Sequence, residues 1–321
     1  MTQAQGRVAA ADLRPGPAVR LGRRVPGLFH RAVLHGLQAA HEPHDPLPAL
    51  LQQAPAGAAL QALRLPGPGG KTLAAWWLRP APVAGRQTFP VALLMHGWGS
   101  NASAMAPLVG PLLRAGLGVL LLDARGHGCS EAGEFTSMPR FAEDIGAGVA
   151  WLCAQIGVDG ARLVLVGHSV GAAAALLYTA RLAGPGEAPR AVISLCAFAH
   201  PEEVMRRWLA ARRIPYVPIG RAVLRHVQRV IGTDFDAIAP LRTVAGLPAA
   251  LLLVHGRDDD TVPFDDALRL RAAAPPGAQL LGVPGDHDLR AALADHEAPL
   301  LDFLAEALLG GPQVTAVSAN G

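Results

Sequence analysis

The stretch Val164-Leu165-Val166-Gly167-His168-Ser169-Val170-Gly171 decides the fold of this chain. Its first three residues are an apolar run typical of a buried strand, and the alanine-rich segment 172–178 is typical of a helix. Between them stands Gly-x-Ser-x-Gly, whose glycines permit a turn too tight for larger side chains. Such a turn lifts the Ser169 hydroxyl to a helix N-terminus, where the helix dipole favours developing negative charge. The pattern predicts a nucleophilic serine on a strand–turn–helix.

Two further strand-like runs end in candidate partners for that serine. Residues 249–254 are apolar and lead into the segment 255–263 (HGRDDDTVP), while residues 279–283 lead into a loop that contains His287. A serine hydroxyl needs a base to take its proton, and the base needs a carboxylate to fix its tautomer. Serine, then aspartate, then histidine, each on a loop after a strand, is the chain order of the α/β-hydrolases.

The donors for a developing oxyanion can be placed in the same way. Residues 90–95 form an apolar strand that ends in the segment 96–100 (HGWGS). In this design one donor is the backbone N–H of the residue after the nucleophile, here Val170, and the other comes from the loop after the third strand. Trp98, which glycines flank, is the candidate for the second donor. Each such donor contributes roughly 3–4 kcal/mol to transition-state stabilisation.

The sequence resembles the α/β-hydrolases of the serine-hydrolase kind, close to the bacterial esterase, lipase and serine aminopeptidase-like group. The blocks that carry the resemblance are 96–99 (HGWG), 123–130 (DARGHGCS), the Ser169 turn, and the 255–263 segment with His287 behind it. The match runs from about residue 60 to about residue 309. In such families the acid is usually the fourth residue after the strand-end histidine, which here is Asp259, with Asp258 and Asp260 as alternatives.

The residue at position 169 differs from that of other branches of the superfamily, and this difference limits the reactions that the resemblance implies. Epoxide hydrolases and haloalkane dehalogenases carry aspartate at the position of Ser169, and dienelactone hydrolases carry cysteine there. The resemblance therefore implies acyl transfer from a small-molecule substrate to water, most simply hydrolysis of a carboxylic ester. Aminopeptidase, amidase or thioesterase activity on the same residues is an alternative. A non-catalytic ligand-binding protein that keeps the fold is an alternative of a different class.

Alternating strand and helix patterns predict an α/β architecture, with a mostly parallel eight-stranded sheet and helices on both faces. In such sheets, sites lie at the carboxyl ends of the strands, where all the blocks fall. The expected strands are 60–65, 72–78, 91–95, 117–122, 162–166, 191–195, 249–254 and 279–283. The expected helices are 102–115, 139–156, 170–181, 265–274 and 298–309.

An insertion at about 200–240 predicts a small helical cap within the 60–309 domain, with helices over 202–213 and 219–231. We expect it to overhang the pocket. A solvated helical face explains most of its charge, and the sharper hypothesis is attraction to an anionic substrate or an anionic lipid surface. The arginines of the cap are Arg206, Arg207, Arg212, Arg213, Arg221, Arg225 and Arg229.

Other polar residues near these blocks have plainer explanations. His168 lies inside the Ser169 turn, where packing or a hydrogen bond to a neighbour explains it better than a role as base. His96 and His255 end buried strands and are expected to be structural. Asp123, which begins the 123–130 block, is expected to stabilise its own loop.

The ends of the chain and its composition set further bounds. Residues 1–59 read as an N-terminal extension with a helix over 26–40, and residues 310–321 as a disordered tail. No apolar run is long enough to span a bilayer, and no apolar signal-peptide core follows Met1. These features, with three scattered cysteines that read as free thiols, predict a cytoplasmic protein.

The charge pattern and the expected chemistry exclude several kinds of partner. The net charge of +3 comes with no basic face interleaved with aromatic residues, so nucleic-acid binding is not expected. A Ser-Asp-His triad supplies nucleophile, base and charge stabilisation, so neither a cofactor nor a metal is expected. His35, His41 and His44 lie in a proline-rich setting, which does not predict a metal site. No pattern predicts the acyl length or the oligomeric state.

Overall fold

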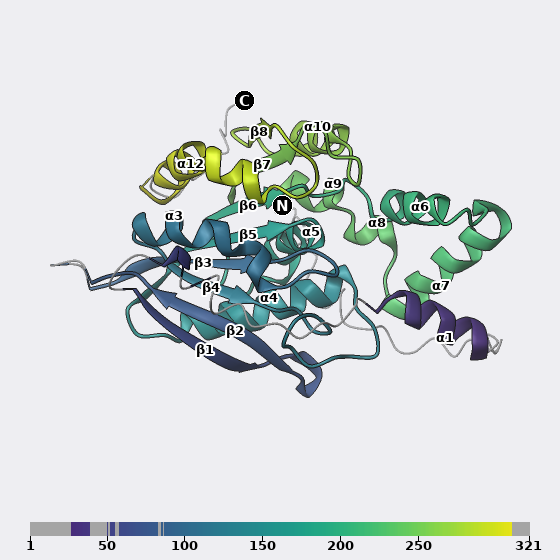
Figure 1. Cartoon of the computed structure of the whole chain (residues 1–321), viewed down its shortest axis with the longest axis horizontal. Coiled ribbons are helices and arrows are strands. Elements are labelled where there is room, and N and C mark those ends of the chain that lie inside the picture. Colours follow the sequence, from purple (N-terminus) through teal and green to yellow (C-terminus); the bar gives the residue numbers. More distant parts are fainter. Residues whose placement is uncertain are drawn as a thin grey trace, which may run out of the picture.

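The computed structural model describes residues 27–38, 50, 52–54, 58–82, 85 and 87–309. Its centre is an eight-stranded sheet in the order β1-β2-β4-β3-β5-β6-β7-β8 (Figure 1). All eight predicted strands are confirmed. The strands are β1 (Ala59–Pro66), β2 (Thr72–Arg79), β3 (Phe89–Met95), β4 (Gly118–Leu122), β5 (Val158–His168), β6 (Ala191–Leu195), β7 (Ala250–Gly256) and β8 (Gln279–Val283).

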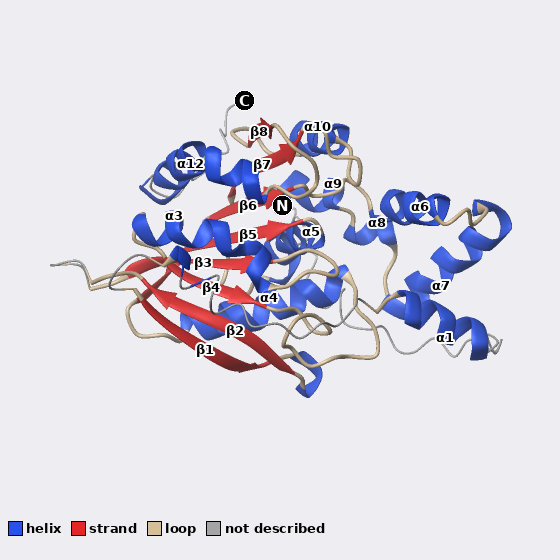
Figure 2. Ribbon diagram, viewed as in Figure 1, coloured by secondary structure: helices blue, strands red, loops and turns tan. Residues whose placement is uncertain are grey.

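The sheet is mostly parallel, as predicted. β2 is antiparallel to both β1 and β4, whereas every pairing from β4 through β3 to β8 is parallel. The carboxyl ends of the parallel strands therefore meet at one edge, toward which the arrowheads point in Figure 2. The loops that carry the predicted site all leave from this edge.

Helices cover both faces because the strands bury side chains on both. In β3, Leu93 and Met95 pack into one apolar cluster and Ala92 and Leu94 into another on the opposite face, as the two-residue strand period requires. The first cluster is covered by α4 (Met138–Cys153), α5 (Val170–Leu177) and α10 (Phe264–Ala273). The second is covered by η3 (Ala102–Leu108), α3 (Val109–Arg114), α11 (Arg290–Asp295) and α12 (Glu297–Leu309).

The cap stands beyond the carboxyl edge of the sheet (Figure 1). The first helix of the described chain, α1 (Gly27–Gly36), packs on it, with Val33 and Leu37 in one apolar cluster with Leu224 and Val227 of the cap. The cap consists of α6 (Pro201–Ala211), the helical turn η5 (Tyr216–Gly220) and α7 (Arg221–Ile231), and α8 (Phe235–Ile238) and α9 (Pro240–Thr243) lead back to the sheet.

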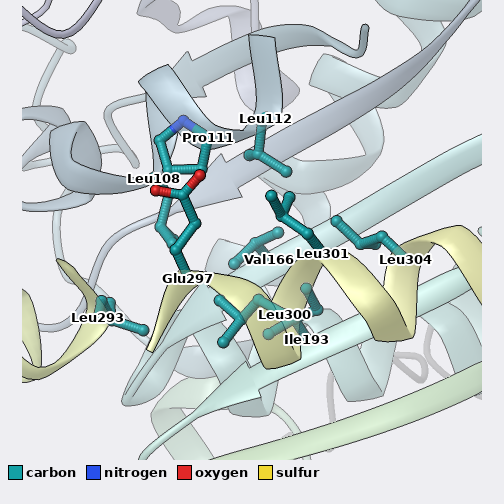
Figure 3. A pocket seen from close by; sticks show the side chains of 10 residues that line it. All are labelled: Leu108, Pro111, Leu112, Val166, Ile193, Leu293, Glu297, Leu300, Leu301 and Leu304. Carbon is teal, nitrogen blue, oxygen red and sulfur yellow. The ribbon is translucent and has the colours of Figure 1, made fainter. Parts of the chain in front are cut away.

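A small hollow between α3 and α12 shows how closely this side of the core is packed (Figure 3). It holds about 10 Å³, room for roughly one water molecule, and leucines make up most of its wall. Glu297 at its rim is paired with Arg114 at 2.7 Å. The hollow is a packing seam and offers no binding site.

The short elements were not predicted, because a single turn gives too little periodicity. These are α8, α9, α11, η2 (Pro68–Gly70) and η6 (Val244–Gly246), whereas η4 (Tyr178–Leu182) continues α5 and lies almost wholly within the helix predicted over 170–181. Within the described residues, none of the helices combines the length and the apolar character needed to cross a bilayer. The expected disordered tail, and the end of the helix expected over 26–40, lie outside the described residues.

Candidate active site

The turn between β5 and α5 holds Ser169 in a strained conformation that its neighbours enforce. Ser169 has φ 53° and ψ −117°, in the region that side chains rarely adopt. A Cβ on Gly167 would lie 2.4 Å from the Gly171 carbonyl oxygen, and a Cβ on Gly171 would lie 2.4 Å from the His96 carbonyl oxygen. Only glycine fits at these two positions, so the sequence Gly-x-Ser-x-Gly is a steric requirement of the turn.

Three residues from distant loops form one hydrogen-bonded chain. His287 Nε2 lies 3.0 Å from Ser169 Oγ, and His287 Nδ1 lies 2.7 Å from Asp259 Oδ2. The structure thus brings together the serine, histidine and aspartate that the sequence pattern singled out. The distances suit a base that takes the serine proton while a carboxylate holds the opposite nitrogen.

Burial distinguishes Asp259 from its two neighbours. Asp259 is buried, whereas Asp258 and Asp260 are exposed. Its Oδ1 accepts the backbone N–H groups of Thr261 and Val262 at 3.0 and 2.7 Å, which leaves Oδ2 facing His287. Burial alone would raise the pKa of Asp259, but the hydrogen bonds from the two histidines beside it and from the backbone outweigh burial and hold that pKa well below its usual range. The carboxyl is therefore ionised at neutral pH, as an orienting acid must be.

The other histidines of the site are structural, as expected. His168 Nε2 lies 2.8 Å from the His287 carbonyl oxygen, so it holds the loop that carries the base. Burial lowers the pKa of His168, which keeps its ring neutral. His96 and His255 are buried, and His255 Nε2 contacts the carbonyl of Val262 at 2.8 Å.

Asp123 stabilises its loop, as expected. Its two carboxylate oxygens accept the backbone N–H groups of Ala102 and Cys129, each at 2.7 Å. Burial raises the pKa of Asp123 to about 6, although these hydrogen bonds and Arg64 oppose the shift. The residue therefore ties the loop after β4 to the start of η3, one wall of the site.

The backbone around the two expected oxyanion donors lies against the serine. A Cβ on Gly97 would approach the Ser169 Cβ to 3.2 Å, so the loop after β3 passes directly beside the nucleophile. Trp98 follows on that loop and borders the same pocket as Ser169. Val170 is the first residue of α5, and the first N–H groups of a helix have no acceptor within it. Their role as donors stays a prediction.

The pocket above Ser169 is built without the cap, and our expectation of an overhanging cap is wrong. The pocket has a volume of about 350 Å³, and among the described residues its lining includes none from 200–240. The walls come from the loop after β3, from η3, and from the loop and helix that follow His287. The residues whose side chains give the pocket its apolar wall are Trp98, Met105, Leu108, Leu195, Leu289 and Leu293. The sequence pattern missed Leu289 and Leu293, since α11 is too short to show a helical period.

Two groups of side chains near His287 contain residue types that can bind a metal ion and have their ligand atoms close together. His168, Cys196 and His287 form one, and Cys196, His255 and Asp259 form the other. Burial raises the pKa of the Cys196 thiol, whereas a metal needs the thiolate. His287 Nδ1 and Asp259 Oδ2 already bond to each other. The donor set therefore does not fit a metal.

Comparison with known proteins shows to which family the chain belongs. Residues 87–232 match the family described as serine aminopeptidase, S33. An uncharacterized protein of Mycobacterium tuberculosis is 30% identical over 216 residues, which cover 67% of this chain and 68% of that protein. The esterase YjfP of Escherichia coli is 28% identical over 214 residues, covering 61% and 79% respectively. The chain belongs to the α/β-hydrolase family of serine hydrolases.

Solved structures show the same fold. An esterase of Pyrococcus furiosus superposes with a TM-score of 0.63 at 17% identity, covering 84% of this chain and 98% of the esterase. Est1E of Butyrivibrio proteoclasticus, solved with ferulic acid bound, gives a TM-score of 0.63 at 20% identity, covering 78% of this chain and all of that one. At these identities the likeness establishes the α/β-hydrolase fold, as the sequence predicted.

Proposed function

We propose that the protein hydrolyses a carboxylic ester through an acyl-enzyme intermediate on Ser169. The observation that carries the proposal is the hydrogen-bonded chain from Asp259 through His287 to Ser169, beside an apolar pocket of about 350 Å³. An apolar pocket with a few convergent polar groups suits the acyl part of a small ester. That two relatives by sequence or structure are described as esterases supports the same reading.

The reaction proceeds in two acyl transfers. Ser169 Oγ attacks the ester carbonyl carbon while His287 Nε2 takes the hydroxyl proton, and Asp259 stabilises the imidazolium. The carbonyl oxygen becomes an oxyanion, which the backbone N–H groups of Trp98 and Val170 bind. The C–O bond then breaks, and the departing alcohol takes the proton from His287. Water attacks the acyl-enzyme with His287 as base, which releases the carboxylic acid and restores Ser169.

The acidic rim of the pocket favours a second candidate function. Asp260, Asp286 and Asp288 line the pocket mouth, although Asp288 is paired with Arg290. Carboxylates at this place would attract the α-ammonium group of an aminoacyl substrate. Cleavage of an N-terminal amino acid, which the family description names, is therefore the alternative on the same residues.

One pair of assays separates these readings. We expect a fluorophosphonate probe to label the purified protein, because labelling requires an activated serine. We also expect p-nitrophenyl esters of short acyl chains to be cleaved with a higher kcat/KM than aminoacyl p-nitroanilides. Labelling together with a preference for the anilides would favour the aminopeptidase. A protein that the probe does not label would be a ligand-binding member of the fold.

We expect the apolar side chains that line the pocket to determine which acyl-chain length the protein prefers. Met105 on η3 is buried and borders the pocket, so Met105→Ala should lengthen the space for the acyl chain. Because one methylene in an apolar pocket changes kcat/KM by roughly tenfold or more, the ratio of long-chain to short-chain ester activity should rise at least about tenfold. Met138→Ala, in the core outside this pocket, is the matched control. An equal change of the ratio in both variants would mean that Met105 acts through stability alone.

A further inference from the structure

The charge of this molecule is concentrated in the cap. The cap helices and η5, residues 201–231, contain seven arginines and two glutamates, so they carry +5. Since the whole chain carries +3, the remainder carries −2. Two of the seven are neutralised locally, Arg206 by Glu202 at 2.7 Å and Arg207 by Glu203 and Asp266 at 3.7 Å. Within the part of the chain that the structure describes, the other five make no ion pair.

Apolar side chains are exposed among these arginines, at the end of the cap where α6 turns into α7. Trp208 is 40% exposed, Val217 68% and Ile219 50%. Arg212, Arg213 and Arg221 beside them are exposed as well. We call this surface the cap tip and define it as Trp208, Arg212, Arg213, Val217, Ile219 and Arg221.

The cap tip is held in shape by the layer beneath it. Leu209, Leu224 and Val227 are buried in the core of the cap, so the fold does not require Val217 or Ile219 to be covered. The Arg212 guanidinium lies 3.7 Å from the Trp208 ring centroid. Arg206 stacks on Tyr216 at 4.0 Å and also donates to its hydroxyl at 2.7 Å, which anchors the start of η5.

We propose that the cap tip binds the surface of an anionic lipid bilayer. Exposed aliphatic and tryptophan side chains enter the headgroup region, while the surrounding arginines pair with lipid phosphates. Nucleic acid would match the charge but would gain nothing from the exposed apolar side chains of Val217 and Ile219. The cap stands beyond the carboxyl edge of the sheet (Figure 2), and the loops of the active site leave from the same edge. Binding through the cap tip would therefore bring this edge toward the membrane.

Liposome sedimentation of the full chain tests this proposal. We expect co-sedimentation with vesicles of phosphatidylglycerol and phosphatidylcholine at low salt, and little with phosphatidylcholine alone. Raising the salt to 0.5 M should weaken binding, because it screens the arginines. Arg221→Gln with Ile219→Ser should lower the partition coefficient on the order of tenfold, since both the charge and the apolar contribution fall.

A matched control variant tests whether the position of the removed side chains matters, and not only their chemical type. Arg79→Gln with Ile156→Ser removes one exposed arginine and one exposed isoleucine outside the cap tip, and should bind vesicles as the native protein does. Hydrolysis of a soluble ester should be unchanged in both double variants, so a loss of binding is separable from a loss of activity. Equal losses in both variants, or equal binding to neutral vesicles, would overturn the proposal. So would binding to a DNA duplex that Ile219→Ser leaves intact, together with no binding to vesicles.

Discussion

Ser169→Ala is expected to lower turnover of a p-nitrophenyl ester by roughly six orders of magnitude, as loss of a triad nucleophile does in comparable enzymes. Alanine keeps the backbone of the turn but has no oxygen to form the acyl-enzyme. The surrounding structure should persist, because the Ser169 N–H bonds to the Leu195 carbonyl at 2.8 Å through the main chain. Thermal unfolding should therefore change little while activity disappears.

The matched control is Ser100→Ala, because Ser100 borders the same pocket without contacting His287. Its kcat should stay within a few-fold of the native value, and a fluorophosphonate should still label it. If the Ser169→Ala protein retained a tenth of the native esterase activity after rigorous purification, another residue would have to be the nucleophile.

Asp259→Asn should lower kcat by about four orders of magnitude, for a reason that the geometry makes specific. Oδ1 accepts two backbone N–H groups, so the amide oxygen will occupy that position and the amide NH₂ will face His287 Nδ1. His287 must then accept at Nδ1 and carry its proton on Nε2. A protonated Nε2 cannot take the proton of Ser169.

The neighbouring aspartates provide the comparison, since Asp258 and Asp260 are exposed whereas Asp259 is buried against His287. Asp258→Asn and Asp260→Asn, each made alone, should stay within a few-fold of native kcat. Steady-state kinetics on one ester would measure all three variants. A near-native Asp259→Asn beside an inactive neighbour would move the orienting acid by one residue.

The Ser169 turn was predictable because its constraint is local. A side chain at Gly167 would clash with the backbone of Gly171, and a side chain at Gly171 would clash with the backbone at the end of β3. The turn therefore requires glycine at both positions, and the sequence pattern shows this requirement directly. The strands were predictable for a related reason, since a buried parallel strand is a short apolar run between turn residues. Asp259 was favoured by resemblance alone, and its burial beside His255 is the physical reason for the choice.

The pocket and the cap were less predictable because they depend on long-range packing. Nothing in the pattern of residues 200–240 indicates where the insertion lies relative to Ser169, and the overhang we expected is absent from the lining of the pocket. Leu293 was missed for the opposite reason. It lies on a helix of a single turn and a half, yet tertiary packing brings it against the site.

The separate core of the cap has a consequence for how this enzyme can diversify. Val33, Leu209 and Leu224 pack into a cluster of their own, distinct from the two that enclose the sheet. We expect mutations in that cluster to alter the cap and α1 while the reaction centre keeps its shape, because, among the described residues, none of the cluster lines the pocket. The catalytic residues and the cap therefore depend on separate cores. Selection can change the sequence and the binding properties of the cap without changing the packing around the catalytic residues.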